Sequence, residues 1–534
     1  MLVAALVAMP VLAVVASLFS ASTRDTWAHL YDTVLVDYVL NSLWLCLGVG
    51  TGVALLGSGA AYLVALHDFP GRRQFEWLLL LPLAMPAYVM AYVYTDLLQF
   101  VGPVQSGLRQ VFGWRAGDYW FPDIRTLPGA ALMFICALYP YVYLLARTAF
   151  IERASGMVDA ARILGLTPWQ AFRRVTLPLS RPAIFAGVLL ALMETLADYG
   201  TVAYFAVPTF TTGIYRAWFS LGDRTAAAQL AACLLGFVLL LLSIERFTRR
   251  RARYYDTTPR RPPQRRHLRG AAAVLAILGC LIPLTLGFLL PAGLLLQLAF
   301  TEGDAQFGSR YWLLARNSFT LAATSAVLAA LLAVLLAYAA RLARSPWPKI
   351  ATRLVGLGYA VPGSVIAVGV LIPVTRLDHA LAALWQQLGH AHPGLLLTGG
   401  IAALVYAYLA RFLSIALQSV EAGMSKITPS MDMAARSLGC GPGATLRRVH
   451  LPLLSSSALA AALLVFVDVM KELPATLVMR PFNFDTLATQ TWTLAADERL
   501  AEASTAALAI VAVGLAPIAL LAHQIARGRQ SVAC

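Results

Sequence analysis

Long apolar segments recur along the whole chain, and they constrain its fold more than any other feature. Many of them exceed the ~18 residues that mark a membrane-spanning helix. Only 13% of the 534 residues are charged, whereas soluble proteins carry about 25%. The sequence therefore predicts an all-α polytopic membrane protein.

We predict about twelve transmembrane helices, arranged as two tandem halves of six. The spans fall near residues 2–20, 38–66, 76–100, 127–149, 182–207, 225–244, 271–300, 318–340, 353–375, 396–420, 453–479 and 503–525. Segment 76–100 contains prolines and is expected to be broken or kinked. The first segment ends in a Ser-Ala-Ser sequence that imitates a signal-peptidase site. It has no basic region before it, however, which favours an uncleaved first span.

Lysine and arginine gather in alternate loops. The basic set contains Arg72, Arg73, Arg153, Arg162, Arg173, Arg174, Arg341, Arg344, Lys349, Lys426, Arg436, Arg447, Arg448, Arg527 and Arg529. Because basic loops stay in the cytoplasm, this set is predicted to be cytoplasmic, and both termini are predicted to face the cytoplasm. The net charge of +15 is thus explained by loop arginines, which argues against nucleic acid as a partner.

A basic stretch divides the chain nearly in half. Residues 246–269 hold ten arginines and three prolines. Like charges and prolines oppose packing into a core, so this stretch is predicted to be a cytoplasmic linker between transmembrane halves 1–245 and 270–534. Contact with anionic membrane lipid is its functional alternative.

The two halves repeat one another at a constant offset, which aligns residues 159–179 with residues 433–453. These stretches match at twelve of 21 positions, with Ala-Ala-Arg, a glycine, a proline and Arg-Arg in register. The same register continues without a gap to Asp223 and Asp497. Both copies begin on basic loops, so the repeat is parallel. A substrate path between the halves is therefore expected.

The repeated loop has the chemistry of a helix–turn–helix at the membrane face. Ala-Ala-Arg favours a helix, and Gly165 or Gly439 is expected to end it in a left-handed turn. A proline three residues later suits the start of a second short helix, and the following Leu-Pro is expected to stop that helix before the next span. Such a loop presents arginines and an apolar ridge to a partner, and an interfacial amphipathic loop without a partner is the alternative.

This loop resembles the EAA motif of ABC importer permeases, which reads Glu-Ala-Ala, three residues, Gly, nine residues, Ile, one residue, Leu-Pro. The family's glutamate is replaced by Asp159 in the first copy and by Met433, beside Asp432, in the second, and its isoleucine is valine in both. The resemblance implies docking of a separate cytoplasmic ATPase dimer. The ATPase-coupling residues that it implies are Asp159, Ala160, Ala161, Gly165, Arg173, Arg174, Pro178, Ala434, Ala435, Gly439, Arg447, Arg448 and Pro452.

The sequence contains no P-loop, because none of its three lysines lies in a Gly-Lys-Ser/Thr sequence. The chain is therefore not expected to be an enzyme or to hold a cofactor. ATP and Mg are expected on the partner ATPase.

Beyond the loops, residues 192–201, 209–218, 468–476 and 480–489 resemble the iron(III) permeases of the binding-protein-dependent family. That resemblance implies an inner-membrane location, an iron(III) cargo and a periplasmic substrate-binding protein as donor. The wider family also moves thiamine, phosphonate, polyamine and sulfate, so these cargoes remain alternatives. An ion-driven secondary transporter is an alternative of a different class, but it has no reason to repeat an ATPase-docking loop.

Charged residues within or near the ends of apolar segments are candidates for the translocation path, since charge inside a bilayer usually faces a cavity or a partner. They are Glu194, Asp198, Asp468, Lys471 and Glu472. Hard trivalent iron prefers carboxylate and tyrosinate oxygens, and Tyr199, Tyr204 and Tyr215 lie nearby in the sequence. The alternative is structural: Lys471 pairs with Asp468 or Glu472, and the acids cap helices. No metal ligand is assigned.

On the predicted outer face, four residues at equivalent positions of the two halves are candidates for contact with the binding protein. They are Trp218, Asp223, Trp492 and Asp497. An interfacial aromatic belt is the alternative explanation for the tryptophans.

Overall fold

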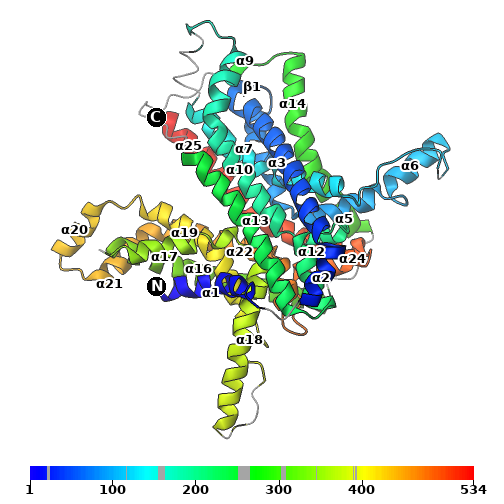
Figure 1. Ribbon diagram of the computed structural model, residues 1–534. Coiled ribbons are helices and arrows are strands. Elements are labelled where there is room, and N and C mark those ends of the chain that lie inside the picture. Colours follow the sequence, from blue (N-terminus) through cyan, green and yellow to red (C-terminus); the bar gives the residue numbers. More distant parts are fainter. Residues whose placement is uncertain are drawn as a thin grey trace. The chain divides into compact units, whose positions relative to one another are not determined.

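The computed structural model describes residues 1–20, 24–115, 117–153, 161, 163–250, 265–301, 308–343, 345–388, 390 and 394–533. Helices make up nearly all of this part of the chain, whose one sheet is a pair of two-residue parallel strands. Ten of its helices are long and apolar enough to cross a membrane, and a bent helix pair makes an eleventh. The prediction of an all-α polytopic membrane protein is therefore confirmed (Figure 1).

The chain divides into two compact units, and neither is a continuous segment. Unit 1 comprises Met1–Leu30, Gly213–Leu235 and Ala305–Gln490. Its elements include α1 (Leu2–Ser17), the first part of α2 (Arg24–Thr33), η3 (Arg216–Ser220), the first part of α13 (Arg224–Arg250), α16 (Ser309–Leu342), α17 (Trp347–Val355), η6 (Gly358–Ala360), α18 (Gly363–Gln387), α19 (Ala402–Met424), α20 (Pro429–Ser437), α21 (Pro442–Thr445), η7 (Leu446–His450), α22 (Leu451–Met470), α23 (Pro474–Met479) and the start of α24 (Leu487–Ala496).

Unit 2 comprises Tyr31–Thr212, Gly236–Asp304 and Thr491–Cys534. Its elements include α3 (Leu35–Leu66), β1 (His67–Asp68), α4 (Arg72–Leu78), η1 (Leu81–Ala84), α5 (Ala87–Leu98), α6 (Pro103–Phe112), α7 (Leu127–Arg153), α9 (Pro168–Ala171), η2 (Phe172–Thr176), α10 (Leu177–Ala197), α11 (Gly200–Tyr204), the start of α12 (Phe210–Tyr215), β2 (Arg266–His267), α14 (Ala271–Leu284), η4 (Thr285–Leu289), α15 (Leu290–Thr301) and α25 (Leu500–Ala533).

Each unit is built on the same three-helix core. In unit 2, α3, α7 and α10 run side by side (Figure 1), and in unit 1, α16, α19 and α22 pack together in the same chain order. Helix α22 begins at Leu451, which is the counterpart in the repeat of Leu177, where α10 begins. Glycine permits the close packing, because a Cβ on Gly57 would lie 2.8 Å from the Tyr139 carbonyl oxygen. The repeat seen in the sequence is therefore also a repeat of structure.

Each unit also contains segments from the other half of the sequence. In unit 1, α1 packs along α18 so closely that a Cβ on Gly369 would lie 2.3 Å from the carbonyl oxygen of Pro10. In unit 2, α14, α15 and α25 pack with first-half elements. The sequence halves 1–245 and 270–534 remain a prediction about the chain, and they differ from the compact units of the structure.

Several predicted span boundaries are wrong, and each error has a local cause. The predicted spans 182–207 and 453–479 end at Ala197 and Met470, because a carboxylate then begins a new short helix. The predicted span 76–100 is broken as expected, with a 90° bend between Arg72–Ala84 and Ala87–Phe112. The predicted span 353–375 is broken by Pro362, and α18 then continues to Gln387. Helix α1 has 16 residues, so it is about 24 Å long, shorter than a typical membrane core.

The expected stop at Leu-Pro is wrong in both repeats. Each short helix continues into the following span through a five-residue π-helix, Phe172–Thr176 or Leu446–His450. The wider π-turn accommodates the proline that follows, which lacks an N–H and crowds the preceding turn.

One end of the basic stretch is packed, and the linker role of residues 246–269 remains a prediction. Residues 251–264 lie outside the described residues, but β2 pairs with β1, and the Leu268 N–H donates to the Asp68 carbonyl at 2.9 Å. The side chain of His267 also lies 3.2 Å from that of Asp68. Backbone pairing and this contact therefore hold the part nearest α14 in place.

Candidate functional site

The first copy of the repeated loop is described at Ala161 and from Ile163 onward. Asp159 and Ala160 lie outside the described residues. Gly165 has φ +84°, the left-handed turn expected from the sequence. The Leu166 N–H donates to the Ala161 carbonyl at 3.1 Å, which closes the turn.

The second helix of this loop, α9, begins with Pro168 and has a capping box. The Gln170 N–H donates to the Thr167 hydroxyl, and the Gln170 side chain accepts the Thr167 N–H. Aromatic packing then fixes the loop against α3, since the Tyr62 and Phe172 ring centroids are 4.3 Å apart. The exposed side chains of this loop include Ile163, Leu164, Trp169, Arg173 and Arg174. These side chains form the apolar ridge and the basic pair that the sequence predicts.

The second copy has the same backbone and a different anchor. Gly439 has φ +80°, and the Cys440 N–H donates to the Ala435 carbonyl at 2.9 Å, which matches the first copy. The exposed residues include Met433, Ala434, Leu438, Arg447 and Arg448, and Pro452 lies at the start of α22 as Pro178 does in α10. The loop thus presents the same kind of surface twice.

An ionic clamp holds the second loop. Asp432 Oδ2 accepts a hydrogen bond from Arg341 Nε at 2.8 Å, and its Oδ1 lies 2.7 Å from His450 Nε2. Arg341 also donates to the carbonyls of Ile427 and Thr428. Asp432 is therefore committed to the permease itself and does not replace the family's glutamate as a partner contact.

We expect Asp432→Asn to loosen this loop by about 1.5–3 kcal/mol, the range for hydrogen bonds to charged groups. Burial opposes ionisation of Asp432, but the hydrogen bonds from Arg341 and His450 outweigh it and lower the pKa of the carboxyl. The clamp's contribution is thus fully present above the usual aspartate pKa of about 4 and is lost as pH falls through the lower folded value.

Limited proteolysis of the loop in membrane vesicles tests this prediction. Asp432→Asn should be cleaved faster than the wild type at neutral pH, and the difference should shrink in acid. Asp497→Asn, at an exposed carboxylate, is the control. Equal protection of Asp432→Asn and the wild type at neutral pH would contradict the clamp.

Two of the predicted path carboxylates occupy equivalent places, between a long helix and a short one. Asp198 Oδ1 accepts the Thr201 N–H at 2.8 Å and so begins α11. Glu472 accepts the N–H groups of Ala475 and Thr476 at 2.9 and 3.0 Å and so begins α23. Both residues therefore have the helix-capping geometry of the structural alternative.

The other charged path candidates are also engaged within their own units. Lys471 pairs with Asp468 at 2.9 Å, as the structural alternative expects, while Glu472 pairs with Arg411 at 3.3 Å. Glu194 is half-buried on α10. A role for these residues in a path remains a prediction.

Arg411 and Arg341 are functional candidates that the sequence analysis missed. Arg411 interrupts the predicted apolar span 396–420, and a charge at such a position is the signal that should have identified it. Arg341 was assigned only to a basic loop, because nothing in the sequence pairs it with Asp432, 91 residues away.

The outer-face candidates divide into structural and exposed residues. Asp223 caps α13, since its Oδ1 accepts the Ala226 N–H at 2.9 Å and its Oδ2 accepts the Thr26 hydroxyl at the same distance. Trp218 is half-buried, and the Arg224 guanidinium lies 5.7 Å from its ring centroid. The role of Asp223 in the fold is thus clear, while its contact with a binding protein remains a prediction.

Trp492 and Asp497, the counterparts of Trp218 and Asp223, have different surroundings. Trp492 packs against Tyr199, with ring centroids 5.8 Å apart, and Asp497 is exposed. Trp492 is therefore part of the packing around α11, and Asp497 is the more accessible of the two.

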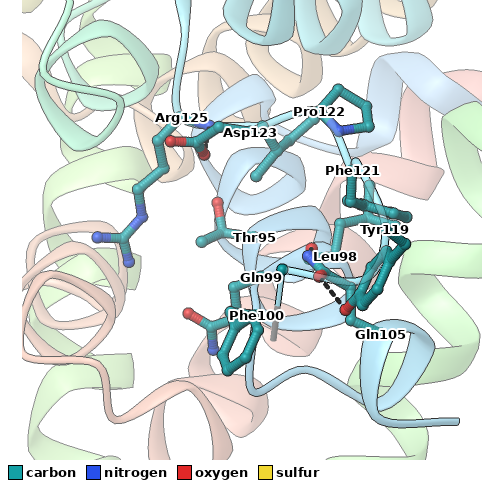
Figure 2. Close-up of a pocket in the computed structure, with 12 residues that line it drawn as sticks. Thr95, Leu98, Gln99, Phe100, Gln105, Tyr119, Phe121, Pro122, Asp123 and Arg125 are labelled. Carbon is teal, nitrogen blue, oxygen red and sulfur yellow. Dashed lines mark hydrogen bonds between the residues drawn. The ribbon is translucent and has the colours of Figure 1, made fainter. Parts of the chain in front are cut away.

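A pocket of about 390 Å³ lies where α5, α6 and residues 117–125 meet (Figure 2). Tyr119 donates to Gln105 at 2.8 Å on one wall, and Asp123 and Arg125 line another. Thr95, on α5, also lines the pocket and is buried. The pocket belongs to unit 2 and lies on the predicted outer side.

Comparison with known proteins identifies transport permeases as similar to this chain. Residues 54–254 match the family model "Binding-protein-dependent transport system inner membrane component". The Fe(3+)-transport system permease protein FbpB 2 of Haemophilus influenzae is 25% identical over 92% of this chain and 90% of its own length. The molybdenum transport permease ModB of Escherichia coli is 28% identical over 40% of this chain, and the sulfate transport permease CysW of the same species is 26% identical over 45%.

The matched region contains the first repeated loop, α7, α10 and the last part of α3. The relative that spans both halves is itself a permease. Together with the helical membrane fold, these findings confirm the resemblance seen in the sequence. Residues 54–254 are therefore a binding-protein-dependent transport inner membrane component, and the chain is similar over nearly its whole length to a permease of this kind.

Proposed function

We propose that this permease moves iron(III) from a periplasmic binding protein into the cytoplasm. The observation that carries the proposal is the extent of the match with an Fe(3+)-transport permease, which covers both halves of this chain. The relatives named for molybdenum, 2-aminoethylphosphonate and sulfate each match less than half of it. Those cargoes, with thiamine and polyamine, are the alternatives for the same machine.

The two repeated loops are proposed to dock a cytoplasmic ATPase dimer, which would hold ATP and Mg. Their exposed apolar residues and arginine pairs, carried on matching left-handed turns, support this role. The chain would then lie in the inner membrane with both termini in the cytoplasm. Asp497 is the outer-face candidate best placed by exposure to meet the binding protein, with Trp218, Asp223 and Trp492 half-buried.

Uptake of radioactive iron(III) tests the cargo. Cells that contain the chain, its ATPase and its binding protein should accumulate iron, and deletion of this chain alone should abolish that uptake. Excess unlabelled molybdate, sulfate, phosphonate, thiamine or polyamine should not compete. If the deletion left iron uptake unchanged and one of these compounds competed, that compound would be the cargo instead.

A further inference from the structure

The two repeats place a carboxylate at the same point but surround it differently. Glu472 is paired with Arg411, and both side chains are buried. In the register of the repeat, the counterpart of Arg411 is Ala137, so the first repeat offers Asp198 no matching arginine. The second repeat thus balances the charge of Glu472 with Arg411. The first repeat has no arginine at the matching position to balance Asp198.

Tyrosines surround the carboxylate of the first repeat. Tyr88 and Tyr92 lie one turn apart on α5, with ring centroids 5.8 Å apart, and Tyr92 meets Tyr204 of α11 edge to face at 4.5 Å. The Tyr92 hydroxyl interacts electrostatically with Asp198 and Tyr199. We call Asp198, Tyr88, Tyr92, Tyr199 and Tyr204 the tyrosine cluster.

The Tyr92 hydroxyl is the most informative member of this cluster. The residue is 1% exposed, and its hydroxyl has no hydrogen-bond partner among the described residues. Buried hydroxyls are normally hydrogen-bonded, so an exception calls for a ligand or another explanation. The cluster therefore holds a buried oxygen ligand that the protein itself does not satisfy.

The second repeat lacks this arrangement. Helices α5 and α18 both begin directly after a proline. When these prolines are aligned, Ser364 and Val368 stand where the first repeat has its two α5 tyrosines. In the register of the repeated loops, the counterpart of Tyr204 is Val478. The second repeat has one buried phenol near its carboxylate, Tyr408, but its hydroxyl is satisfied by Thr476 at 2.6 Å. The group of several tyrosines with an unsatisfied hydroxyl is thus a property of the first repeat.

We propose that the tyrosine cluster is a transient oxygen-ligand site for iron(III) on its way through the permease. This inference rests on the proposed function. Iron(III) prefers carboxylate and phenolate oxygens, and each phenol that coordinates it exchanges its proton for the metal and releases that proton to the solvent. Within the described residues no group of three or more His, Cys, Asp and Glu side chains could hold a metal, so phenolic oxygens have to supply the ligands.

The outer pocket lies beside this cluster. Arg125 lines the pocket, and its guanidinium lies 5.1 Å from the Tyr204 ring centroid. Thr95, also in the pocket wall (Figure 2), is one turn beyond Tyr92 on α5. Glu498 lies 3.2 Å from Arg125 and balances its charge. The pocket and the cluster are therefore neighbours, with Arg125 and Thr95 between them.

The test uses the complete transporter, reconstituted with its ATPase and binding protein. Iron(III) citrate is titrated into wild type, Tyr92→Phe and Tyr139→Phe, and the visible charge-transfer band of iron(III)–phenolate is recorded with uptake of radioactive iron. Tyr139 is the matched control, because it is also a fully buried tyrosine of unit 2 whose hydroxyl has no partner among the described residues. Both substitutions remove one oxygen and keep the ring.

Tyr92→Phe should weaken the band and slow uptake by about tenfold or more, the scale of losing one metal-site partner, while Tyr139→Phe behaves as wild type. A wild type that takes up iron, with Tyr92→Phe unchanged in band and uptake, would overturn this inference and leave the proposed function standing. A wild type that takes up no iron would overturn both.

Discussion

Replacing Gly165 and Gly439 together by valine is expected to abolish ATP-coupled uptake while the protein remains inserted in the membrane. Both glycines have φ near +80°, a conformation that strains a β-branched residue by about 1–3 kcal/mol. A Cβ at either position would meet no atom within 4 Å, so the strain is confined to the backbone of the turn. The turn would relax, and the ridge that follows it would lose its orientation toward the ATPase.

The measurement compares ATP hydrolysis and iron uptake in the same reconstituted vesicles. Hydrolysis should continue without dependence on the binding protein, and uptake should stop. Gly394→Val is the control, because Gly394 also has a positive φ and open space for a Cβ but lies on the predicted outer side. Unchanged uptake in the double variant would show that the loops do not couple the ATPase.

The left-handed turns were predictable because the sequence carries their cause locally. A glycine directly after a helix-forming segment, found twice at one spacing, leaves few other conformations. The continuation of each short helix past Leu-Pro into the following span was not predictable in the same way. It depends on a π-turn, a rare conformation that forms directly before Leu-Pro in both repeats and has no simple sequence signature.

The roles of the charged residues were less predictable, because each depends on a distant partner. The sequence identifies Asp432 as an acid beside the motif, but only the fold brings Arg341 and His450 to it. Similarly, Ala137 and Arg411 occupy equivalent positions, and their difference matters only once α19 lies against α23. Helix α1 of the first sequence half packs in unit 1, and α25 of the second half packs in unit 2. The sequence does not predict this, since apolar spans carry little information about which helices they contact.

Arg411→Met is expected to destabilise the permease by about 3–5 kcal/mol, the cost of leaving a buried charge without its partner. Arg411 and Glu472 are 7% and 5% exposed, so neither can recover water when the other is removed. Thermal unfolding of the purified protein in detergent measures the loss. Lys471→Met is the control, because the Lys471–Asp468 pair is more exposed and should contribute less than about 1 kcal/mol.

A second substitution separates the charge from the packing. Glu472→Gln keeps one of the two oxygens that accept the N–H groups of Ala475 and Thr476 at the start of α23 but removes the charge that Arg411 balances. Adding it to Arg411→Met should therefore restore most of the lost stability, since no buried charge remains unpaired. If the double variant were as unstable as Arg411→Met, Arg411 would act by filling space between α19 and α23. The difference between the two repeats would then be one of packing, and Asp198 would need no special explanation for its lack of an arginine.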